Sequence, residues 1–227
     1  MNKPSLDIYI VNGNITIFCG THSDRFKNDI LNSSLFSALV AAKPGTDREK
    51  SWSTYTDTLG KLFWVVNSRN TQRLEFKNKS LLDIVDQGAD GDLPNLERQA
   101  LADAFSALTK LQSDSLPVKN FVAKLQANIS TATNSDVSVS TTAILTIVCN
   151  NKSVITLQTA FRTAHPIAID LLDRPELTSI NNGTNNFRLM RCLLDEHRYN
   201  GISAKIQDKL VKKIEAELLH INLPTDK

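Results

Sequence analysis

The chain has 227 residues, of which 41% are hydrophobic and 22% charged, and its formal net charge is +2. A chain of this length buries about 70% of its unfolded surface, so it needs neither disulfides nor a metal to hold a core. The near balance of charge gives no reason to expect a nucleic-acid partner. Composition therefore excludes a strongly basic nucleic-acid-binding protein and a disulfide-stabilised miniprotein, and indicates an ordinary globular protein.

The composition of the first segment and the spacing of the cysteines indicate a reducing compartment. Polar residues interrupt the apolar character of the first segment, which lacks the form of a signal peptide. No run of about 18 consecutive apolar residues follows. Cys19, Cys149 and Cys192 form no CxxC pair and are typical of free buried thiols. We expect a protein that is cytoplasmic as synthesised, with release by a non-classical route still open.

A β-hairpin is the strongest local prediction. Two β-rich runs, 6–11 and 14–19, are joined by Asn12-Gly13, the residue pair that best tolerates the positive φ angles of a two-residue turn.

Apolar periodicity, caps and turn residues predict the other elements in chain order. In the first half they are a helix over 26–42 capped by Ser23 or Asp24, a short strand over 73–77, a helix from Ser80 to Gly88, a helix over 96–111 and a helix after Ser115. Between the first helix and the short strand lies a helical stripe of Trp52, Tyr55, Leu59, Leu62, Phe63 and Val66. In the second half they are an extended segment over 166–172, a loop over 180–186, a strand over 187–194 and a helix over 202–219. Serine, threonine and asparagine dominate 128–140.

The stretch 137–161 alternates apolar and polar residues along two predicted strands. A three-residue loop, 150–152, keeps the apolar residues of both strands on one face, because a slip of one residue would flip every side chain. We therefore predict a bulged hairpin that pairs Leu145 with Leu157 and Ile147 with Ile155. The apolar face, which is the candidate contact surface for a membrane or a partner, consists of Val137, Val139, Leu145, Ile147, Ile155, Leu157 and Phe161.

Two roles are open for this hairpin. Its strands are long enough to cross a bilayer, with a polar face for a lumen and an apolar face for lipid. Against that role, Ile144 and Val148 make the polar face partly apolar, which is typical of a central strand covered by helices. The chain also has no glycine hinge between Gly91 and Gly183. These observations favour a packed sheet strand.

Common catalytic and metal-binding motifs are absent. The sequence has no GxSxG elbow, phosphate loop, GxGxxG fingerprint or HExxH. Asp86, Asp90 and Asp92 carry oxygens that suit Ca²⁺, but their spacing fails the DxDxDG loop and lacks its closing glutamate. A solvated turn is favoured over a cation site there, and we expect no cofactor.

The most enzyme-like cluster contains Cys192, Asp195 and His197. A thiol, an imidazole and a carboxylate could form a nucleophilic triad. On a strand, however, side chains five positions apart face opposite sides, so the following turn would have to fold back. A buried strand cysteine followed by a charged turn is the simpler interpretation.

Strands at the two ends of the chain and helices between them predict an α+β fold, with a mostly antiparallel sheet layered with amphipathic helices. The sheet would combine the N-terminal hairpin with the C-terminal strands. We expect a single domain over 1–227, with a helix-rich half, 1–127, and a strand-rich half, 128–227.

Three functional hypotheses follow. The first is a non-enzymatic bacterial-type protein that acts by binding another protein or by self-association as a homo-oligomer. The second is a membrane-active virulence or toxin-like protein that uses the hairpin 137–161. The third is a cysteine-dependent hydrolase or transferase centred on Cys192. A second copy or another protein is the expected partner, a membrane is possible only under the second hypothesis, and no nucleic acid is expected.

Overall fold

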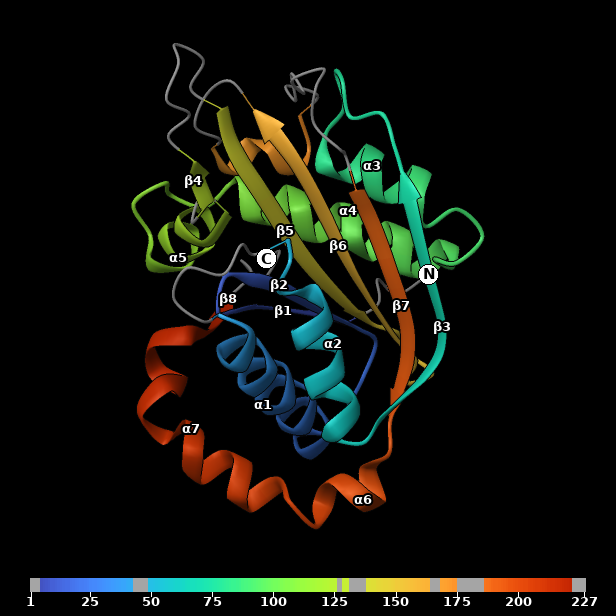
Figure 1. Cartoon of the computed structure of the whole chain (residues 1–227), viewed down its shortest axis with the longest axis vertical. Helices are drawn as coiled ribbons and strands as arrows, with labels where there is room; N and C mark the ends of the chain where they lie inside the picture. The colour runs from blue at the N-terminus through green and yellow to red at the C-terminus, as the bar shows by residue number, and fades with distance from the viewer. Residues whose placement is uncertain are drawn as a thin grey trace.

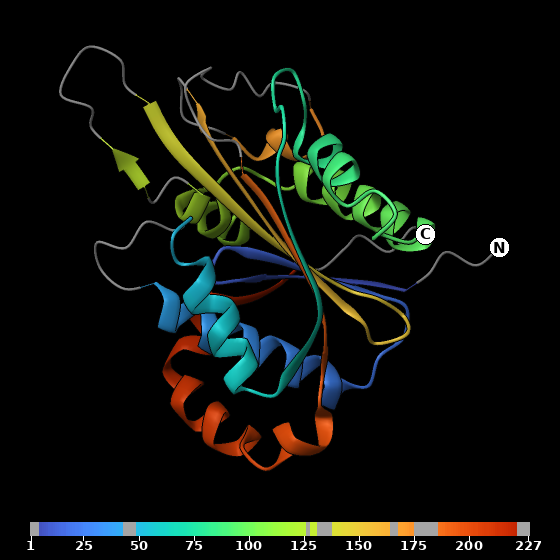
Figure 2. The ribbon, with the colours of Figure 1, turned by 45° about the vertical axis from the view of Figure 1, so that its right-hand side comes forward.

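The computed structural model describes residues 5–42, 49–125, 128–130, 138–163, 168–174 and 186–221. These residues form an α+β fold in which one twisted sheet lies between two layers of helices (Figures 1 and 2). The sheet is mostly antiparallel. The predicted fold class is confirmed.

The strands come from both halves of the chain. The first half contains β1 (Leu6–Val11), β2 (Asn14–Cys19), α1 (Asp24–Ala41), α2 (Trp52–Lys61), β3 (Trp64–Arg73), α3 (Leu81–Gly88), α4 (Asn95–Thr109) and α5 (Leu116–Leu125). The second half contains β4 (Asn128–Ser130), β5 (Ser138–Val148), β6 (Val154–Thr163), the 3-10 helix η1 (Ile169–Leu172), β7 (Asn186–Leu194), α6 (Glu196–Asn200), α7 (Ser203–Glu217) and β8 (Leu218–Ile221).

The strand order places the central hairpin in the middle of the sheet. The order is β3-β7-β6-β5-β2-β1-β8, and β4 pairs with β5 beside this path. Among the described strands, only β2 and β5 pair in parallel, with Ile15 opposite Leu145 and Ile17 opposite Ile147. This pair joins the N-terminal hairpin to the C-terminal strands and leaves β3 and β8 at the two edges.

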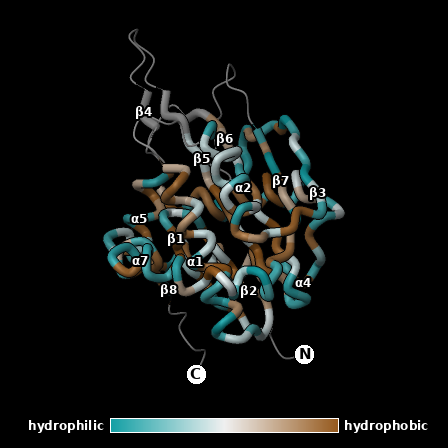
Figure 3. The backbone as a smooth tube through the Cα atoms, turned by 60° about the horizontal axis from the view of Figure 1, so that its bottom comes forward, coloured by the Kyte–Doolittle hydropathy of each residue, from teal (hydrophilic) through white to brown (hydrophobic). Residues whose placement is uncertain are grey.

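Helices cover both faces of the sheet, so each face has its own hydrophobic core. Helices α3, α4 and α5 lie on one face and α1, α2, α6 and α7 on the other (Figure 2). Leu145 of β5 packs in the first core with Phe105 of α4, whereas Val148 of β5 packs in the second with Tyr55 of α2. Apolar segments accordingly gather between sheet and helices (Figure 3). Strand β5 is therefore buried on both sides.

The central hairpin has the predicted register. Leu145 pairs with Leu157 and Ile147 with Ile155. The loop 150–152 is closed by a hydrogen bond from the Cys149 amide to the Ser153 carbonyl, 2.8 Å long, and Lys152 adopts a positive φ of 66°. A residue in this left-handed region is the bulge that a three-residue hairpin loop requires.

The threonines of this hairpin are buried wherever the structure describes their side chains, although such residues ordinarily indicate a solvated face. Thr146 and Thr156 are 1% and 0% exposed, and their Oγ1 atoms lie 3.4 Å apart. Gln158 is also fully buried, and its Oε1 accepts a 2.6 Å hydrogen bond from Arg188. Cross-strand polar pairs of this kind let polar side chains lie under helices, because a buried polar group is costly only without a partner.

Several predicted elements match closely. Ser23 caps α1 by accepting from the Phe26 amide, and Ser80 forms a reciprocal capping box with Asp83 at the start of α3. Helices α4, α5 and α7 and strand β7 lie where periodicity placed them. The predicted loop 180–186 falls outside the described residues except for Asn186, which begins β7.

The predicted helical stripe ends earlier than the sequence suggests. Helix α2 stops at Lys61, and Phe63 adopts a positive φ of 65°, which redirects the chain into β3. Val66 is therefore a strand residue opposite Cys192, not a helical one. The prediction of a strand over 73–77 was also wrong. The strand is Trp64–Arg73, and Phe76 lies in the loop after the strand with its side chain buried.

Two further corrections concern short elements. The predicted extended segment over 166–172 contains η1 at Ile169–Leu172, where the adjacent Leu171 and Leu172 are both buried. Burial of neighbours in sequence does not fit the two-residue period of a strand. Strand β8 was missed because its residues continue the apolar pattern of α7, yet Ile221 pairs with Ile8 of β1.

The turn between β1 and β2 gives a test of the fold. Asn12 and Gly13 have φ angles of 48° and 76°. A Cβ is disfavoured in this region, so Gly13→Ala should lower the free energy of unfolding by about 1 kcal/mol. Asn12→Gly is the matched control and should be tolerated because glycine adopts positive φ freely. Chemical denaturation measures both, and an unchanged midpoint for Gly13→Ala would contradict the turn described above.

Candidate functional site

The Cys192 thiol lies inside the second hydrophobic core. The residue is 0% exposed on β7, and its Sγ donates a 3.5 Å hydrogen bond to the Val154 carbonyl. Burial raises the pKa of this thiol well above its usual range, and the opposing effect of Arg69 is smaller. The neutral thiol is thus favoured, whereas a nucleophilic cysteine needs its thiolate.

Asp195 and His197 belong to a different environment. Asp195 caps α6 by accepting a 3.0 Å hydrogen bond from the Arg198 amide, and its carboxylate also pairs with the Arg198 side chain. His197 is exposed on α6. No described base contacts the Cys192 thiol, so the structure does not assemble the nucleophile and base that the hydrolase or transferase hypothesis requires.

The three aspartates at the end of α3 and in the loop after it are divided between two arginines. Asp86 and Asp90 lie 3.6 and 3.8 Å from Arg98, and Asp92 lies 3.5 Å from Arg191. Within the described ranges, no group of three or more His, Cys, Asp and Glu side chains is placed to hold a metal ion. The solvated ion-paired turn fits this geometry better than a cation site does.

The apolar face of the central hairpin is part of the first core. Leu145, Ile147, Ile155, Leu157 and Phe161 are each at most 2% exposed. Both β5 and β6 are paired on both edges.

The structure describes no side chain for two members of the predicted contact surface. Val137 lies outside the described residues, and for Val139 the structure describes only the backbone, which pairs in β5 with Ile129 and Thr163. In the described part of the chain no helix combines the length and the apolar character that crossing a membrane needs.

Strand β3 forms an open edge of the sheet, which the sequence did not reveal. Strand β3 pairs with β7 on one side, and no described strand pairs with its other side (Figure 1). Most of its residues are exposed. A bulge interrupts the register between Val66 and Ser68, after which residues 68–73 pair regularly with β7. An open edge presents unpaired amide and carbonyl groups to any extended chain that approaches it.

Side chains along this edge are apolar at the start and basic in the middle and at the end. Arg69 and Arg73 form no ion pair with any described residue, and β3 contains no acidic residue. At the start of the strand Val65 is 51% exposed and lies opposite Leu193, which is 39% exposed. The signal in the sequence was a polar run that contains no glycine, proline or acidic residue. Such a run is interpreted as a loop, because an edge strand shows little alternation of apolar and polar residues.

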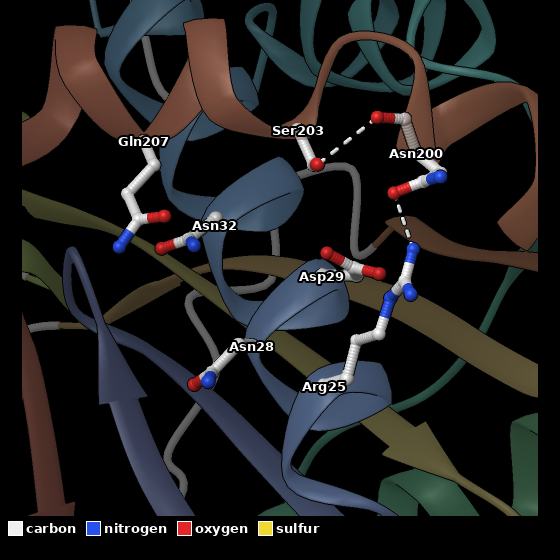
Figure 4. A pocket seen from close by; sticks show the side chains of 7 residues that line it. All are labelled: Arg25, Asn28, Asp29, Asn32, Asn200, Ser203 and Gln207. Carbon is white, nitrogen blue, oxygen red and sulfur yellow. Dashed lines mark hydrogen bonds between the residues drawn. The ribbon is translucent and has the colours of Figure 1, made fainter.

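A polar cavity lies between α1 and the pair α6–α7 (Figure 4). Its volume is about 460 Å³. Helix α1 contributes Arg25, Asn28, Asp29 and Asn32, and the facing helices contribute Asn200, Ser203 and Gln207. The signal in the sequence was a stripe of polar residues spaced three and four apart on α1, a face that normally carries apolar residues where two helices pack.

Comparison with known proteins gives little that bears on function. No protein-family model matches the chain, and no curated protein sequence matches it. Among solved structures, the chain is similar to the Evf virulence factor, with a TM-score of 0.40 and 11% sequence identity over 96% of this chain and 85% of that one. We transfer no property of that protein at this level of similarity.

The buried state of Cys192 gives a test of the thiol assignment. In the folded protein at mildly alkaline pH, Cys192 should react with a maleimide only as fast as the protein unfolds, because the thiol is inaccessible and its pKa is raised. The same measurement in denaturant is the control and should label all three cysteines quickly. Fast labelling of Cys192 in the folded state, located by peptide mass spectrometry, would restore the nucleophile hypothesis.

Proposed function

We propose that this protein is a non-enzymatic binding protein that captures an extended segment of another protein by strand addition along β3. The observation that carries the proposal is the open edge of β3, where most residues of the ten-residue strand are exposed. In strand addition, backbone hydrogen bonds supply affinity and alternate side chains supply specificity. Residues 68–73, beyond the bulge, offer a regular template for this pairing.

The side chains of the edge define the chemistry of the segment. Arg69 and Arg73 carry positive charge with no acidic residue on the strand to offset it. Opposite-charge pairs across neighbouring strands are favourable, so acidic residues should lie opposite these arginines. Val65 and Leu193 form an exposed apolar pair at the start of the strand and would accept an apolar residue of the partner. The expected segment is therefore extended, acidic in its centre and apolar at one end.

A second copy of the chain is a poorer partner for this edge. Two β3 strands with their centres aligned would bring Arg69 of one copy beside Arg69 of the other. Like charges in that position are destabilising. Charged residues on an edge also protect a sheet from pairing with copies of itself.

The membrane-active alternative lacks a comparable feature. It needs the hairpin 137–161 to leave the sheet, yet β5 and β6 are paired on both edges and their described side chains are buried on both faces. Release would therefore break the ladders on both sides and expose both cores. No observation favours that route over strand addition at an edge that is already open.

A peptide-binding measurement tests the proposal. The probe is a fluorescent ten-residue peptide that alternates valine or threonine with glutamate, and the comparison peptide replaces each glutamate with lysine. Fluorescence anisotropy should show that the acidic peptide binds and the basic one does not, because only the former complements Arg69 and Arg73. Arg69→Glu/Arg73→Glu should remove this binding and create binding of the basic peptide.

The matched control is Lys212→Glu/Lys213→Glu, which makes the same change in charge on the exposed face of α7. It should leave the affinity for the acidic peptide nearly unchanged. Equal binding of both peptides, or equal losses in the two charge-reversed variants, would show that attraction is a matter of overall charge and would refute capture at β3. Failure of the acidic peptide to bind at all would do the same.

A further inference from the structure

Asp29 is the unusual residue of the polar cavity between α1 and α6–α7. It is only 7% exposed, and its carboxylate accepts no hydrogen bond from the described residues. In Figure 4 the carboxylate lies between Arg25 and Ser203. A buried carboxylate without a partner is costly, so such groups normally have one.

The nearest cation does not fill this role. The guanidinium of Arg25 donates its hydrogen bond to Oδ1 of Asn200, as the dashed line in Figure 4 shows. Burial raises the pKa of the Asp29 carboxyl, and this effect exceeds the lowering by Arg25. Glu196 adds further negative potential at Asp29. Arg25 is thus near Asp29 but hydrogen-bonds to Asn200, and its effect on the Asp29 carboxyl is smaller than the effect of burial.

Tyr199 adds a second incomplete group beside Asp29. Its hydroxyl is buried and has no hydrogen-bond partner within the described ranges, and the charge of Asp29 contributes to raising its pKa, after burial itself. A hydrogen bond between the Tyr199 hydroxyl and the Asp29 carboxylate would satisfy both groups, but the structure does not form it. Asp29 of α1 and Tyr199 of α6 are thus close enough to influence one another, yet no hydrogen bond joins them.

We propose that this cavity binds a small ligand that carries a primary ammonium group together with hydroxyl groups, as an amino sugar does. Asp29 would accept hydrogen bonds from the ammonium, which supplies a compensating positive charge. The carboxamides of Asn28, Asn32 and Gln207 both donate and accept hydrogen bonds, as hydroxyl groups require.

The dimensions and lining of the cavity suit this class. A volume of about 460 Å³ lies within the range of about 300–1,000 Å³ that is usual for small-molecule sites. No aromatic residue lines the cavity among the described residues, so a flat aromatic ligand would find no ring to stack on. The residues belong to α1, α6 and α7, and the proposal does not depend on strand addition at β3.

Calorimetric titration with glucosamine and glucose tests the proposal on the full chain. The two sugars differ in one position, where an ammonium replaces a hydroxyl. Glucosamine should bind, and glucose should bind about ten-fold or more weaker, because a hydrogen bond to a charged partner is roughly twice as strong as a neutral one. Absence of glucosamine binding, or equal binding of both sugars, would overturn the proposal.

Two variants locate the binding. Asp29→Asn keeps the shape of the side chain and removes its charge, so it should abolish the preference for glucosamine. It should also raise the melting temperature, because it removes an unpaired buried charge. The control, Asp208→Asn, makes the same charge change at an exposed position of α7 outside the cavity and should keep the preference. Retention of the preference in Asp29→Asn would place the ammonium elsewhere and overturn the assignment.

Discussion

The parallel pairing of β2 with β5 is the contact on which the arrangement of the sheet depends. Each of these strands belongs to an antiparallel hairpin formed by residues close in sequence, whereas their own pairing joins residues about 130 positions apart, such as Ile15 and Leu145. The described part of the long connection carries helices α1 to α5 and strands β3 and β4. Closing it makes one sheet from two hairpins, fixes β5 in the centre and determines which strands remain at the edges.

Central position explains the composition of the 137–161 hairpin. A strand covered by helices on both faces must bury both of its faces. Here one face is mostly aliphatic, and the other mixes threonine and glutamine with apolar residues such as Ile144 and Val148. The buried pair Thr146 and Thr156, and Gln158 with Arg188, show how neighbouring strands satisfy part of these polar groups. The hydroxyls of Thr141, Thr142 and Thr159 have no hydrogen-bond partner among the described residues. A run of threonines can thus lie in the interior of a sheet and does not require either solvent or a membrane pore.

Local signals predicted local structure well. The Asn12-Gly13 turn, the cap at Ser80 and the pairing of Leu145 with Leu157 each depend on a few neighbouring residues, and all are present. Long-range pairing left no such signal. Strand β3 was missed because its exposed residues alternate little, and β8 because its partner, β1, lies at the other end of the chain. Asp29 was missed because only the approach of α6 and α7 turns a polar helix stripe into a cavity.

The two proposed sites share one physical feature: groups that are able to pair and have no described partner. At β3 they are the outward amides and carbonyls of the backbone together with Arg69 and Arg73. In the cavity it is the Asp29 carboxylate, and the buried Tyr199 hydroxyl is a further such group close to Asp29. The cysteines and loop aspartates, which resembled functional groups in the sequence, instead have structural environments that account for them.

Residue-resolved amide hydrogen exchange of the free protein tests the central claim, that the β2–β5 pairing buries the hairpin and leaves β3 open. Amides of β5 and β6 should exchange only through global unfolding, the slowest process in the molecule. Alternate amides of β3, those that point away from β7, should exchange far faster. Fast exchange throughout β5 and β6, or uniform protection along β3, would contradict the arrangement on which both the sheet order and the proposed function rest.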